Sequence, residues 1–382
     1  MRILHTSDWH LGRIFYGIYL TDDQAYVLEK FIELVKDAKP DVIVISGDIY
    51  DRSVPPVEAV DLFDDVVTHI LIDYKVPIIA ISGNHDNPDR LGFGYRIMGE
   101  NGFKISCRLD MDAMTTVLED EYGPVYFYSI PYVEPAVTRE KFQDETIHTH
   151  DDSMKKIVGY IKENMNRKCR KVLVAHAYAA GCDGCESERP LSVGGSGAVD
   201  PSVFKGFDYT ALGHLHNPQK VGCEEIRYSG SLMKYSFDEA KHKKCVYIVD
   251  MDQYGKVNIK GVELKPRRDI RCIEGCLDEL KKGPKPGENK DDYIMATVKD
   301  KKAILDVYGQ LRCIYPNLLH VERPQYDASG NICSPGENYK KMNDVDLFSS
   351  FYKQVTDNEI SKEQGETLKE LLDKYYQELR EA

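Results

Sequence analysis

Short apolar runs rich in β-branched residues recur along the first 250 residues, and segments of helical periodicity lie between them. The runs occupy 2–5, 41–46, 77–82, 171–176 and 243–250. Between the first two runs, one helical face carries Val27, Leu28, Phe31, Ile32, Leu34 and Val35. Thr21 and Gln24 have the spacing of a capping box, which predicts that this helix begins at Thr21.

A second helix is expected after Pro55 and Pro56. Its apolar positions are Val60, Phe63, Val66, Val67 and Ile70. The first part of the chain therefore has the order strand, helix, strand, helix, strand, which is typical of layered α/β proteins.

The remaining chain predicts two smaller units. The first domain is expected over 1–265, a small α/β capping domain over 266–333, and a linker with C-terminal helices over 334–382. Within the capping domain, 281–292 reads as a loop and 293–300 as a strand. The helix that follows is expected to turn four residues inward: Ile304, Leu305, Val307 and Leu311.

Two amphipathic helices are expected near the C-terminus. The first has an apolar stripe of Leu347, Phe348, Phe351, Tyr352 and Val355. The second, capped by Ser361 with Gln364, has a stripe of Leu368, Leu371, Leu372, Tyr375 and Leu379. They could pack as a hairpin on themselves or dock on a partner; the amount of apolar surface favours docking.

Composition narrows the class of protein. A length of 382 residues predicts at least two domains, and no apolar run is long enough to span a membrane. The start "MRILHTS" lacks the apolar core of a signal peptide, so a cytoplasmic location is expected. The formal net charge of −13 argues against a stand-alone nucleic-acid binder, so any DNA contact must be local or assisted.

Ten cysteines are spread along the chain, which favours reduced thiols over a disulfide framework. Cys182 and Cys185 form the one close pair. Cys272 and Cys276 have a different spacing and lie far away, so we interpret the first pair as loop cysteines and not as half of a zinc site.

Polar side chains with metal-binding chemistry lie at five expected strand ends, four of them the ends of runs given above and the fifth after "DYTALG". They are Asp8 and His10; Asp48 and Asp51; Asn84, His85 and Asp86; His176; and His214 with His216. Taken singly, each has an ordinary structural explanation, as a hydrogen-bonded histidine, a helix cap or a turn residue. Together they predict a site, because ligands collect at the carboxyl ends of strands in an α/β sheet. His5 lies inside its strand and is expected in the core or behind the site.

The order D-x-H, G-D, G-N-H-D, H and G-H-x-H resembles that of the calcineurin-like metallophosphoesterases, over residues 1 to 250. The stretches "ILHTSDWHLG", "GDIYDRSVPP", "ERPLSVGGSG" and "YSGSLMKYSF" are similar to the SbcD-type nuclease subunits of that superfamily. The resemblance implies a layered α/β β-sandwich flanked by helices, with a small α/β capping domain and a C-terminal helical hairpin.

The resemblance also implies two divalent metal ions. Asp8, His10, Asp48 and His216 would bind one ion, and Asp48, Asn84, His176 and His214 the other. Asp48 could bridge them if its two oxygens face different ions. The mixture of imidazole, carboxylate and amide ligands favours Mn²⁺, with Mg²⁺ or another divalent ion as alternatives.

Four catalytic residues are proposed around these ligands. His85 would act on the transition state or the leaving oxygen, or else only support a ligand, and Asp86 would orient its ring. Asp51 would orient either a metal ligand or His85, since relatives in archaea and eukaryotes tend to have histidine there. Arg52 would contact phosphate or form a surface ion pair.

Two glycine-containing stretches, 189–201 and 229–244, flank the ligands and are candidates for binding the phosphates of the substrate. The side chains proposed for this role are Arg189, Ser231 and Lys234, together with Arg52. The alternative is that both stretches are ordinary loops.

The function implied is that of a Mn²⁺-dependent DNA nuclease subunit with double-strand exonuclease and single-strand endonuclease activity, working in DNA end processing and repair. The implied partners are DNA, an SMC-like ATPase subunit SbcC bound through 340–382, and a second copy of this chain within a heterotetramer, without a membrane. The expected location is the cytoplasm, at the nucleoid. The alternatives are a small-molecule or phosphoprotein phosphoesterase and a non-catalytic scaffold of the same fold.

Overall fold

A computed structural model describes residues 1–324 except 167, 192–196 and 301–303, together with scattered positions between 345 and 371. The chain divides into two compact units, residues 1–296 with 306–321, and residues 297–305 with 322–382. The first unit contains the predicted first domain and most of the predicted capping domain, so the boundaries at 265 and 333 stay predictions.

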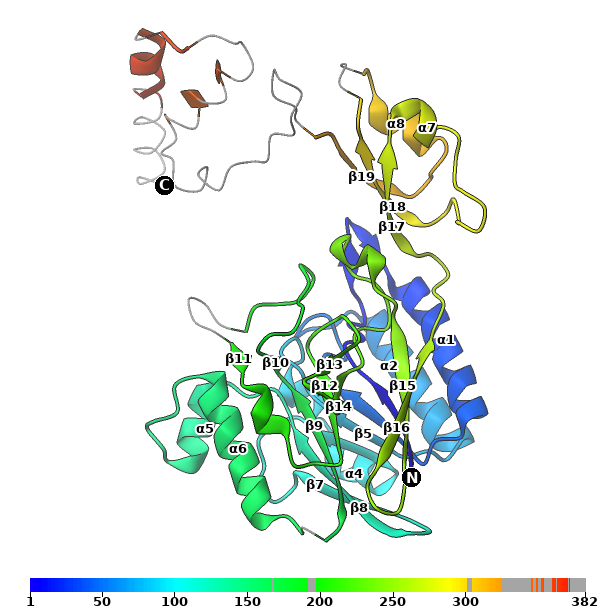
Figure 1. Ribbon diagram of the computed structural model, residues 1–382, viewed down its shortest axis with the longest axis vertical. Coiled ribbons are helices and arrows are strands. Elements are labelled where there is room, and N and C mark those ends of the chain that lie inside the picture. The colour runs from blue at the N-terminus through cyan, green and yellow to red at the C-terminus, as the bar shows by residue number, and fades with distance from the viewer. Residues whose placement is uncertain are drawn as a thin grey trace. The chain divides into compact units, whose positions relative to one another are not determined.

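Two six-stranded sheets form the centre of the first unit (Figure 1). In spatial order, sheet one consists of β16 (Val257–Glu263), β15 (Cys245–Met251), β1 (Arg2–Thr6), β4 (Val42–Ser46), β5 (Ile78–Ile81) and β6 (Phe103–Ser106). Sheet two consists of β13 (Gln219–Val221), β14 (Cys223–Tyr228), β12 (Tyr209–Gly213), β9 (Arg170–His176), β8 (Gly123–Ile130) and β7 (Thr115–Asp120).

The central strands are apolar along their whole length because both of their faces are covered. In β4, Val42 and Val44 pack between the two sheets, whereas Ile43 and Ile45 pack against the helices. β1, β4 and β5 run parallel to one another, as do β9 and β12. Parallel strands buried on both faces read as continuous hydrophobic runs, which is why the sequence showed them clearly.

Helices cover the outer face of each sheet, so the predicted layered β-sandwich is confirmed (Figure 1). The helices of the first unit up to residue 164 are α1 (Thr21–Ala38), α2 (Val57–Thr68), α3 (Pro88–Leu91), α4 (Tyr95–Glu100), α5 (Pro135–Phe142) and α6 (His150–Asn164). Shorter elements are β2 (Ile14–Phe15), β3 (Ile18–Tyr19), η1 (His69–Asp73), β10 (Tyr178–Ala179), β11 (Ala198–Val199), η2 (Pro201–Phe204) and η3 (Asp238–Lys241).

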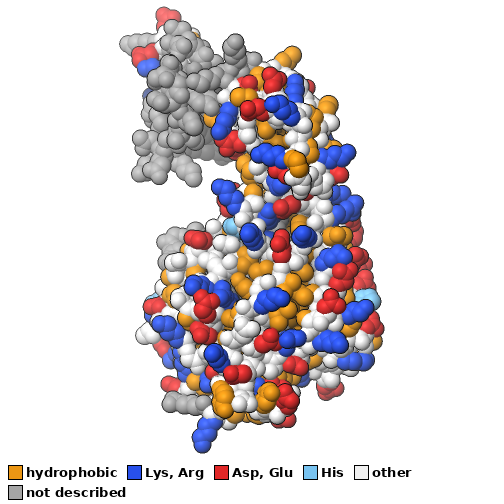
Figure 2. Space-filling view, turned by 45° about the vertical axis from the view of Figure 1, so that its right-hand side comes forward, with side chains coloured by type: hydrophobic (Ala, Val, Ile, Leu, Met, Phe, Trp, Pro, Cys, Tyr) orange, Lys and Arg blue, Asp and Glu red, His pale blue; other side chains and the backbone are white. Residues whose placement is uncertain are grey.

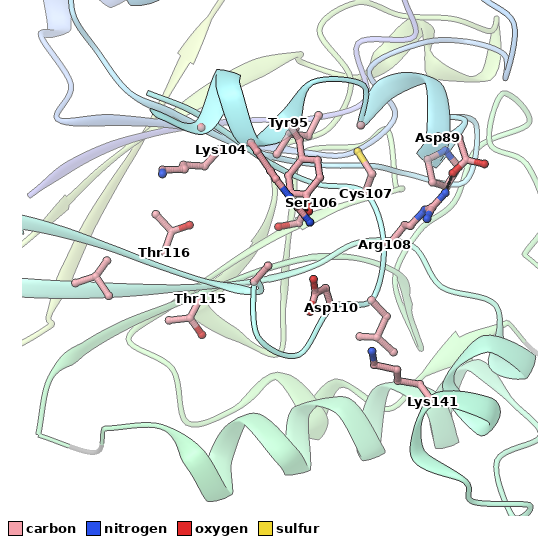
Figure 3. Close-up of a pocket in the computed structure, with 18 residues that line it drawn as sticks. Asp89, Tyr95, Lys104, Ser106, Cys107, Arg108, Asp110, Thr115, Thr116 and Lys141 are labelled. Atoms are coloured by element: carbon pink, nitrogen blue, oxygen red, sulfur yellow. Dashed lines mark hydrogen bonds and ion pairs between the residues drawn. The ribbon is translucent and has the colours of Figure 1, made fainter. Parts of the chain in front are cut away.

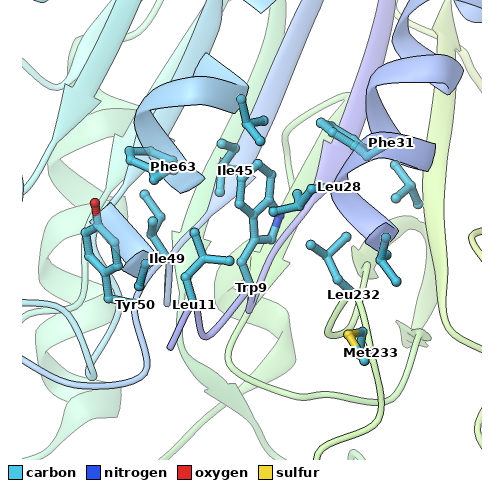
Figure 4. Close-up of a cluster of buried hydrophobic side chains, with 14 of the residues drawn as sticks. Trp9, Leu11, Leu28, Phe31, Ile45, Ile49, Tyr50, Phe63, Leu232 and Met233 are labelled. Atoms are coloured by element: carbon cyan, nitrogen blue, oxygen red, sulfur yellow. The ribbon is translucent and has the colours of Figure 1, made fainter. Parts of the chain in front are cut away.

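Trp9 is the centre of the packing between sheet one and its helices (Figure 4). Its ring is fully buried and lies 5.6 Å from that of Phe31 in α1 and 6.0 Å from that of Phe63 in α2, both edge to face. Aromatic rings in this geometry stabilise each other beyond their buried area. Trp9 lies between Asp8 and His10, so this contact anchors the loop that carries them.

Gln24 was expected to cap α1, and this prediction is wrong. The structure gives α1 no side-chain cap, and Gln24 is buried. Its side chain accepts a hydrogen bond from the Gly12 amide at 3.0 Å and donates to the carbonyls of His10 at 2.8 Å and Trp9 at 3.2 Å. A buried amide satisfies whichever backbone groups lie nearest, and here they belong to the loop after β1.

The small α/β part consists of a three-stranded sheet with two short helices: β17 (Ile270–Gly275), α7 (Leu277–Leu280), β18 (Tyr293–Val298), α8 (Val307–Arg312) and β19 (Leu318–Glu322). Tyr293 and Arg268 both bond to the buried carboxylate of Asp23 in α1, at 2.7 and 3.0 Å. Val307 and Leu311 are buried as predicted, but Leu305 is 90% exposed. Asp306 caps the helix by accepting from the Gly309 amide at 2.9 Å, so α8 begins after Leu305.

Two helices were predicted near the C-terminus, and most residues of their apolar stripes lie outside the described part of the chain. The capping box is confirmed, because Ser361 and Gln364 exchange hydrogen bonds at 2.9 and 3.2 Å.

Candidate metal centre

The predicted ligands meet at the edge where parallel strands of the two sheets end. Sheet one contributes Asp8 and His10 after β1, Asp48 after β4 and Asn84 after β5; sheet two contributes His176 at the end of β9, and His214 and His216 after β12. All are buried except Asn84, which is partly exposed.

Three groups of side chains could each hold a metal ion: Asp8 with His10 and His216, Asp48 with His176 and His214, and His10 with Asp51 and His85. The first two consist of predicted ligands and are called the first and the second group below. In the first group, Nε2 of His10 lies 3.0 Å from Nε2 of His216. In the second, Oδ1 of Asn84 lies 2.9 Å from Nε2 of His176 and 3.1 Å from Nδ1 of His214.

Asp48 lies between the two groups, but not in the way expected. One oxygen, Oδ2, is 3.7 Å from Nε2 of His10 and 3.4 Å from Nε2 of His176. The other, Oδ1, accepts a hydrogen bond from the His85 amide at 2.9 Å. The two oxygens therefore do not face different groups, because the backbone after β5 occupies one of them.

The chemistry of the donor atoms fits a bound cation. Nδ1 of His176 donates to the carbonyl of Ser46 at 2.9 Å, so in the neutral ring Nε2 has only a lone pair to offer. That lone pair faces oxygens of Asn84 and Asp48, which are also acceptors. Burial lowers the pKa of His176, yet the nearby carboxylates of Asp48 and Asp8 and the Ser46 carbonyl raise it to about 9. Acceptor atoms that face one another in this way are stabilised by a positive charge between them, which divalent ions would supply.

Burial determines the direction of the pKa shift at three further ligands, Asp8, His10 and His214. It raises the pKa of Asp8 to about 6, and it holds the pKa values of His10 and His214 well below the usual range for histidine. Neutral imidazole is the form that binds metal.

The backbone is strained where the ligands are attached. Asp8, His10, Asp48 and His214 have positive φ angles of 52°, 47°, 49° and 109°. Non-glycine residues adopt such angles when the surrounding structure forces them, often at functional sites. Gly213 precedes His214, and a Cβ atom there would lie 1.9 Å from the carbonyl oxygen of Ser46. Only glycine lets the ends of β12 and β4 approach this closely.

His85 lies beside the first group, with its ring centroid 4.6 Å from that of His10. Its Nδ1 donates to the carbonyl of Asp51 at 2.7 Å, which leaves Nε2 available. The prediction that Asp86 orients this ring is wrong. The Asp86 carboxylate is buried and accepts hydrogen bonds from the amides of Ile49, Tyr50 and Gly83 at 3.1, 2.9 and 2.9 Å. Asp86 therefore joins the loops after β4 and β5, and burial with the nearby Asp48 raises its pKa to about 7.

Asp51 serves both residues that were considered for it. Its carbonyl holds His85, and its carboxylate oxygen Oδ1 lies 3.6 Å from Nδ1 of His10 and accepts from Arg13 at 2.8 Å. Arg52 is exposed, and its side chain donates to the Gly12 carbonyl at 3.2 Å.

The three side chains proposed for phosphate binding lie in different surroundings. Arg189 is exposed. Ser231 is buried and donates to the Met233 carbonyl at 2.7 Å. Lys234 is partly buried, and its ammonium donates to Asp269 at 2.9 Å and to the Ala240 carbonyl at 2.8 Å. The contacts of Ser231 and Lys234 lie within the protein, so Arg189 and Arg52 are the members of this set that face solvent.

Sequence reasoning missed the residues behind His216. Nδ1 of His216 lies 2.7 Å from Oγ of Ser187 and 3.4 Å from Oε1 of Glu239, a fully buried carboxylate. Lys244, also buried, pairs with Glu239 and donates to the His216 carbonyl at 2.6 Å. Burial opposes ionisation of Glu239, but Lys244 and His216 keep its pKa well below the usual range. Glu239 and Lys244 fall within the predicted stretch 229–244, which is the one signal that pointed to them, whereas Ser187 lies outside both predicted stretches.

Cys182 and Cys185 are both partly buried, and Sγ of Cys185 lies 3.9 Å from Nδ1 of His242. Among the described residues, neither cysteine belongs to a group that could hold a metal ion.

The fold and the two ligand groups define a class of phosphate-ester hydrolases. The family model for calcineurin-like phosphoesterases matches residues 1–218, and the model for the type 5 capsule protein repressor C-terminal domain matches residues 266–356. The chain therefore belongs to the calcineurin-like phosphoesterases, as the motifs predicted.

Within this class, the similarity to a known relative extends over almost the whole chain. The SbcD subunit of the nuclease SbcCD from Staphylococcus saprophyticus is 34% identical over 373 residues, which cover 97% of this chain and 98% of the relative. The chain belongs to the family of SbcD nuclease subunits. Solved structures that this chain matches include a protein of Thermus thermophilus (TM-score 0.40, 13% identity, 69% of this chain and 99% of that one) and a dimetal phosphatase of Danio rerio (TM-score 0.43, 12% identity, 69% of this chain and 96% of that one).

In the described part of the chain, the structure has no helix of the length and apolar character needed to cross a membrane.

Proposed function

We propose that this chain is the nuclease subunit of an SbcCD-type DNA end-processing and repair complex. It hydrolyses phosphodiester bonds in DNA with two divalent ions, Mn²⁺ by first choice, as an exonuclease on duplex ends and an endonuclease on single strands. The observation that carries the proposal is the pair of buried ligand groups that share Asp48 at the strand ends. Similarity to a nuclease subunit along the whole chain supports it.

The division of ligands would be that expected from the motifs. Asp8, His10, Asp48 and His216 would hold one ion, and Asp48, Asn84, His176 and His214 the other. When bound, two such ions would activate water and neutralise charge on the phosphate.

The protein's own residues would handle positioning and protons. The Asp51 carbonyl fixes the His85 ring through Nδ1, so Nε2 is the atom that, in the imidazolium form of the ring, would carry the proton and pass it to the leaving oxygen. Asp86 would act indirectly, by holding the loops that carry Asp48 and Asn84. Arg52 and Arg189, both exposed, would contact phosphates further along the strand.

The charge distribution explains why a partner is part of the proposal. On the face of the molecule shown in Figure 2, Lys and Arg side chains are interspersed with Asp and Glu, so the basic groups do not form one continuous surface there. With a net charge of −13, the chain would depend on help to hold DNA. We therefore propose an SMC-like ATPase subunit of the SbcC type as the partner, bound through residues 340–382, and a cytoplasmic, nucleoid-associated location.

A second copy of the chain is proposed as a further partner. Val57 and Val60 in α2, and Phe93 and Ile97 around α4, are apolar and exposed, with Phe93 84% accessible. The helices that follow the second and third strands therefore present apolar side chains that a second copy of the chain could cover.

The test is cleavage of linear duplex, hairpin and circular single-stranded DNA, beside a chromogenic phosphodiester, with Mn²⁺, Mg²⁺ or chelator, and with or without the ATPase. We expect Mn²⁺-dependent cleavage of DNA. Turnover of the chromogenic ester without any DNA cleavage would instead support a small-molecule phosphoesterase, and no turnover of any substrate would support a scaffold.

Removal of residues 340–382 tests the assignment of the partner. We expect the shortened chain to cleave short single-stranded DNA as before, but to lose co-purification with the ATPase and ATP-stimulated processing of duplex ends. A stable complex between the shortened chain and the ATPase in size-exclusion chromatography would contradict this assignment and favour a helical hairpin packed on itself.

A further inference from the structure

A cavity of about 770 Å³ opens at the edge of the sandwich (Figure 3). It is bounded by α3 and α4 on one side, by the edge strands β6 and β7, and by the end of α5. None of the seven candidate ligands lines it. Its volume falls within the range of about 300–1,000 Å³ typical of small-molecule sites.

The charge of the cavity is opposite to that of the chain. Four basic side chains line it, Arg96, Lys104, Arg108 and Lys141, against two acidic ones, Asp89 and Asp110. Arg108 forms an ion pair with Asp89. The hydrogen bond to Tyr95 raises the pKa of Arg96, and the charge of Asp110 adds to this shift. Among the described residues, Lys104 and Lys141 form no ion pair, so two positive charges remain for a ligand. In a protein with a net charge of −13, this local excess favours an anion.

The two lysines reach the cavity from different elements, as Figure 3 shows. Lys104 belongs to β6, and Lys141 lies in the last turn of α5. A lysine on an edge strand can be explained as protection against pairing with another strand. That explanation does not apply to Lys141, which comes from a helix on the other side of the cavity.

The remaining lining adds the features that recognise a nucleoside. Tyr95 is 39% exposed, and the Arg96 guanidinium lies 5.6 Å from the centre of its ring. A ring held in this way offers a face on which a base can stack. Ser106, Thr115 and Thr116 supply hydroxyl groups around the same space.

We propose that this cavity binds a nucleotide, with its base on Tyr95 and its phosphate at one of the two lysines, Lys104 or Lys141, which lie at opposite ends of the cavity (Figure 3). The ligand is either a free mononucleotide or the terminal nucleotide of a single strand, since both present the same phosphate and base. This part of the proposal rests on the proposed nuclease function, because cleavage of DNA would produce both free mononucleotides and strand ends. Binding itself needs no metal and is independent of that function.

The test is titration calorimetry of the full chain in chelator, which silences the metal centre, with deoxynucleoside 5′-monophosphates, inorganic phosphate and the unphosphorylated deoxynucleoside. We expect the monophosphate to bind more tightly than either fragment. Short single strands with and without a 5′-phosphate distinguish a strand end from a free nucleotide.

The variants are Lys104→Met with Lys141→Met, each also made singly in case the double variant does not fold, and Tyr95→Leu. We expect the double lysine variant and one of the two single variants to weaken nucleotide binding about tenfold or more, since loss of the lysine beside the phosphate removes a charge-assisted contact. Lys260→Met is the matched control, because Lys260 is an exposed lysine on β16, the opposite edge strand of the same sheet.

Absence of monophosphate binding at millimolar concentration, or equal binding by the lysine variants and the Lys260→Met control, would overturn the proposal. Cleavage of DNA by the double variant in Mn²⁺ is measured in parallel. Normal cleavage together with lost nucleotide binding confirms a separate site, whereas failure of the wild-type chain to cleave DNA counts against the nuclease function alone.

Discussion

The two ligand groups of the metal centre are supported in different ways. His176, in the second group, is oriented by a backbone carbonyl, that of Ser46, which no substitution can remove. His216, in the first group, is oriented by the side chains of Ser187 and Glu239, and Lys244 completes a buried network behind them. His10, also in the first group, has no hydrogen-bond partner for Nδ1 among the described residues, and Asp51 lies 3.6 Å away.

The difference predicts that the two ions respond differently to substitution. Groups behind a ligand fix its orientation, and their loss typically weakens metal binding about 10- to 100-fold. In the second group, the carbonyl that orients His176 belongs to the backbone of the sheet, so side-chain substitutions leave it in place. In the first group it comes from loops, so single side-chain changes there should affect one ion and leave the other in place.

The largest effect is expected from Asp48→Ala, which removes what the two groups share. Both ions should be lost, because Oδ2 of Asp48 lies within 3.7 Å of His10 and 3.4 Å of His176. Nuclease activity should fall by more than the roughly 10- to 100-fold typical of a supporting residue. Calorimetry with Mn²⁺ measures the number of ions bound, with Asp37→Ala at an exposed position of α1 as control. Two bound ions and full cleavage in Asp48→Ala would refute the shared site.

The next largest effect is expected on turnover alone, from His85→Gln. Nε2 of His85 is proposed to transfer a proton and not to bind metal, so both ions should still bind, while kcat falls about 100-fold. The exposed His69 provides the control, as His69→Gln. If calorimetry instead shows the loss of an ion, His85 is a ligand, a role that its place in a group with His10 and Asp51 would then explain.

Glu239→Gln should separate the two groups. We expect the affinity of one ion to fall about 10- to 100-fold, with the other unchanged, because only His216 loses its carboxylate partner. The buried Lys244 would lose its counter-ion in this variant, so thermal unfolding is measured as well, and Ser187→Ala offers a milder change at the same imidazole. Asp238→Asn, at the exposed neighbouring position, is the control and should change neither the affinity for metal ions nor the thermal unfolding. Equal weakening of both ions would show that Glu239 supports the whole loop and not one ligand.

The same contrast explains what the sequence could predict. The ligands were predictable because each follows an apolar strand, and strands buried on both faces are the clearest pattern in the chain. Glu239 and Gln24 were not, because a buried polar residue is defined by the groups it meets after folding, and these come from distant segments. Asp86 was assigned to the wrong partner for the same reason, since three backbone amides from two loops converge on it.

Asp51→Asn should have the smallest effect and tests the weakest support. The substitution keeps the backbone carbonyl that holds His85, so kcat should change little, but it removes the negative charge beside Nδ1 of His10 and the partner of Arg13. The carboxylate is partly exposed, and such pairs contribute up to about 1 kcal/mol, which corresponds to about a fivefold loss of affinity for one ion. Calorimetry and kcat measured on the same preparation separate the two roles. A fall in kcat with both affinities intact would mean that the carboxylate acts on the substrate side through His85, and that His10 needs no support beyond its strained backbone.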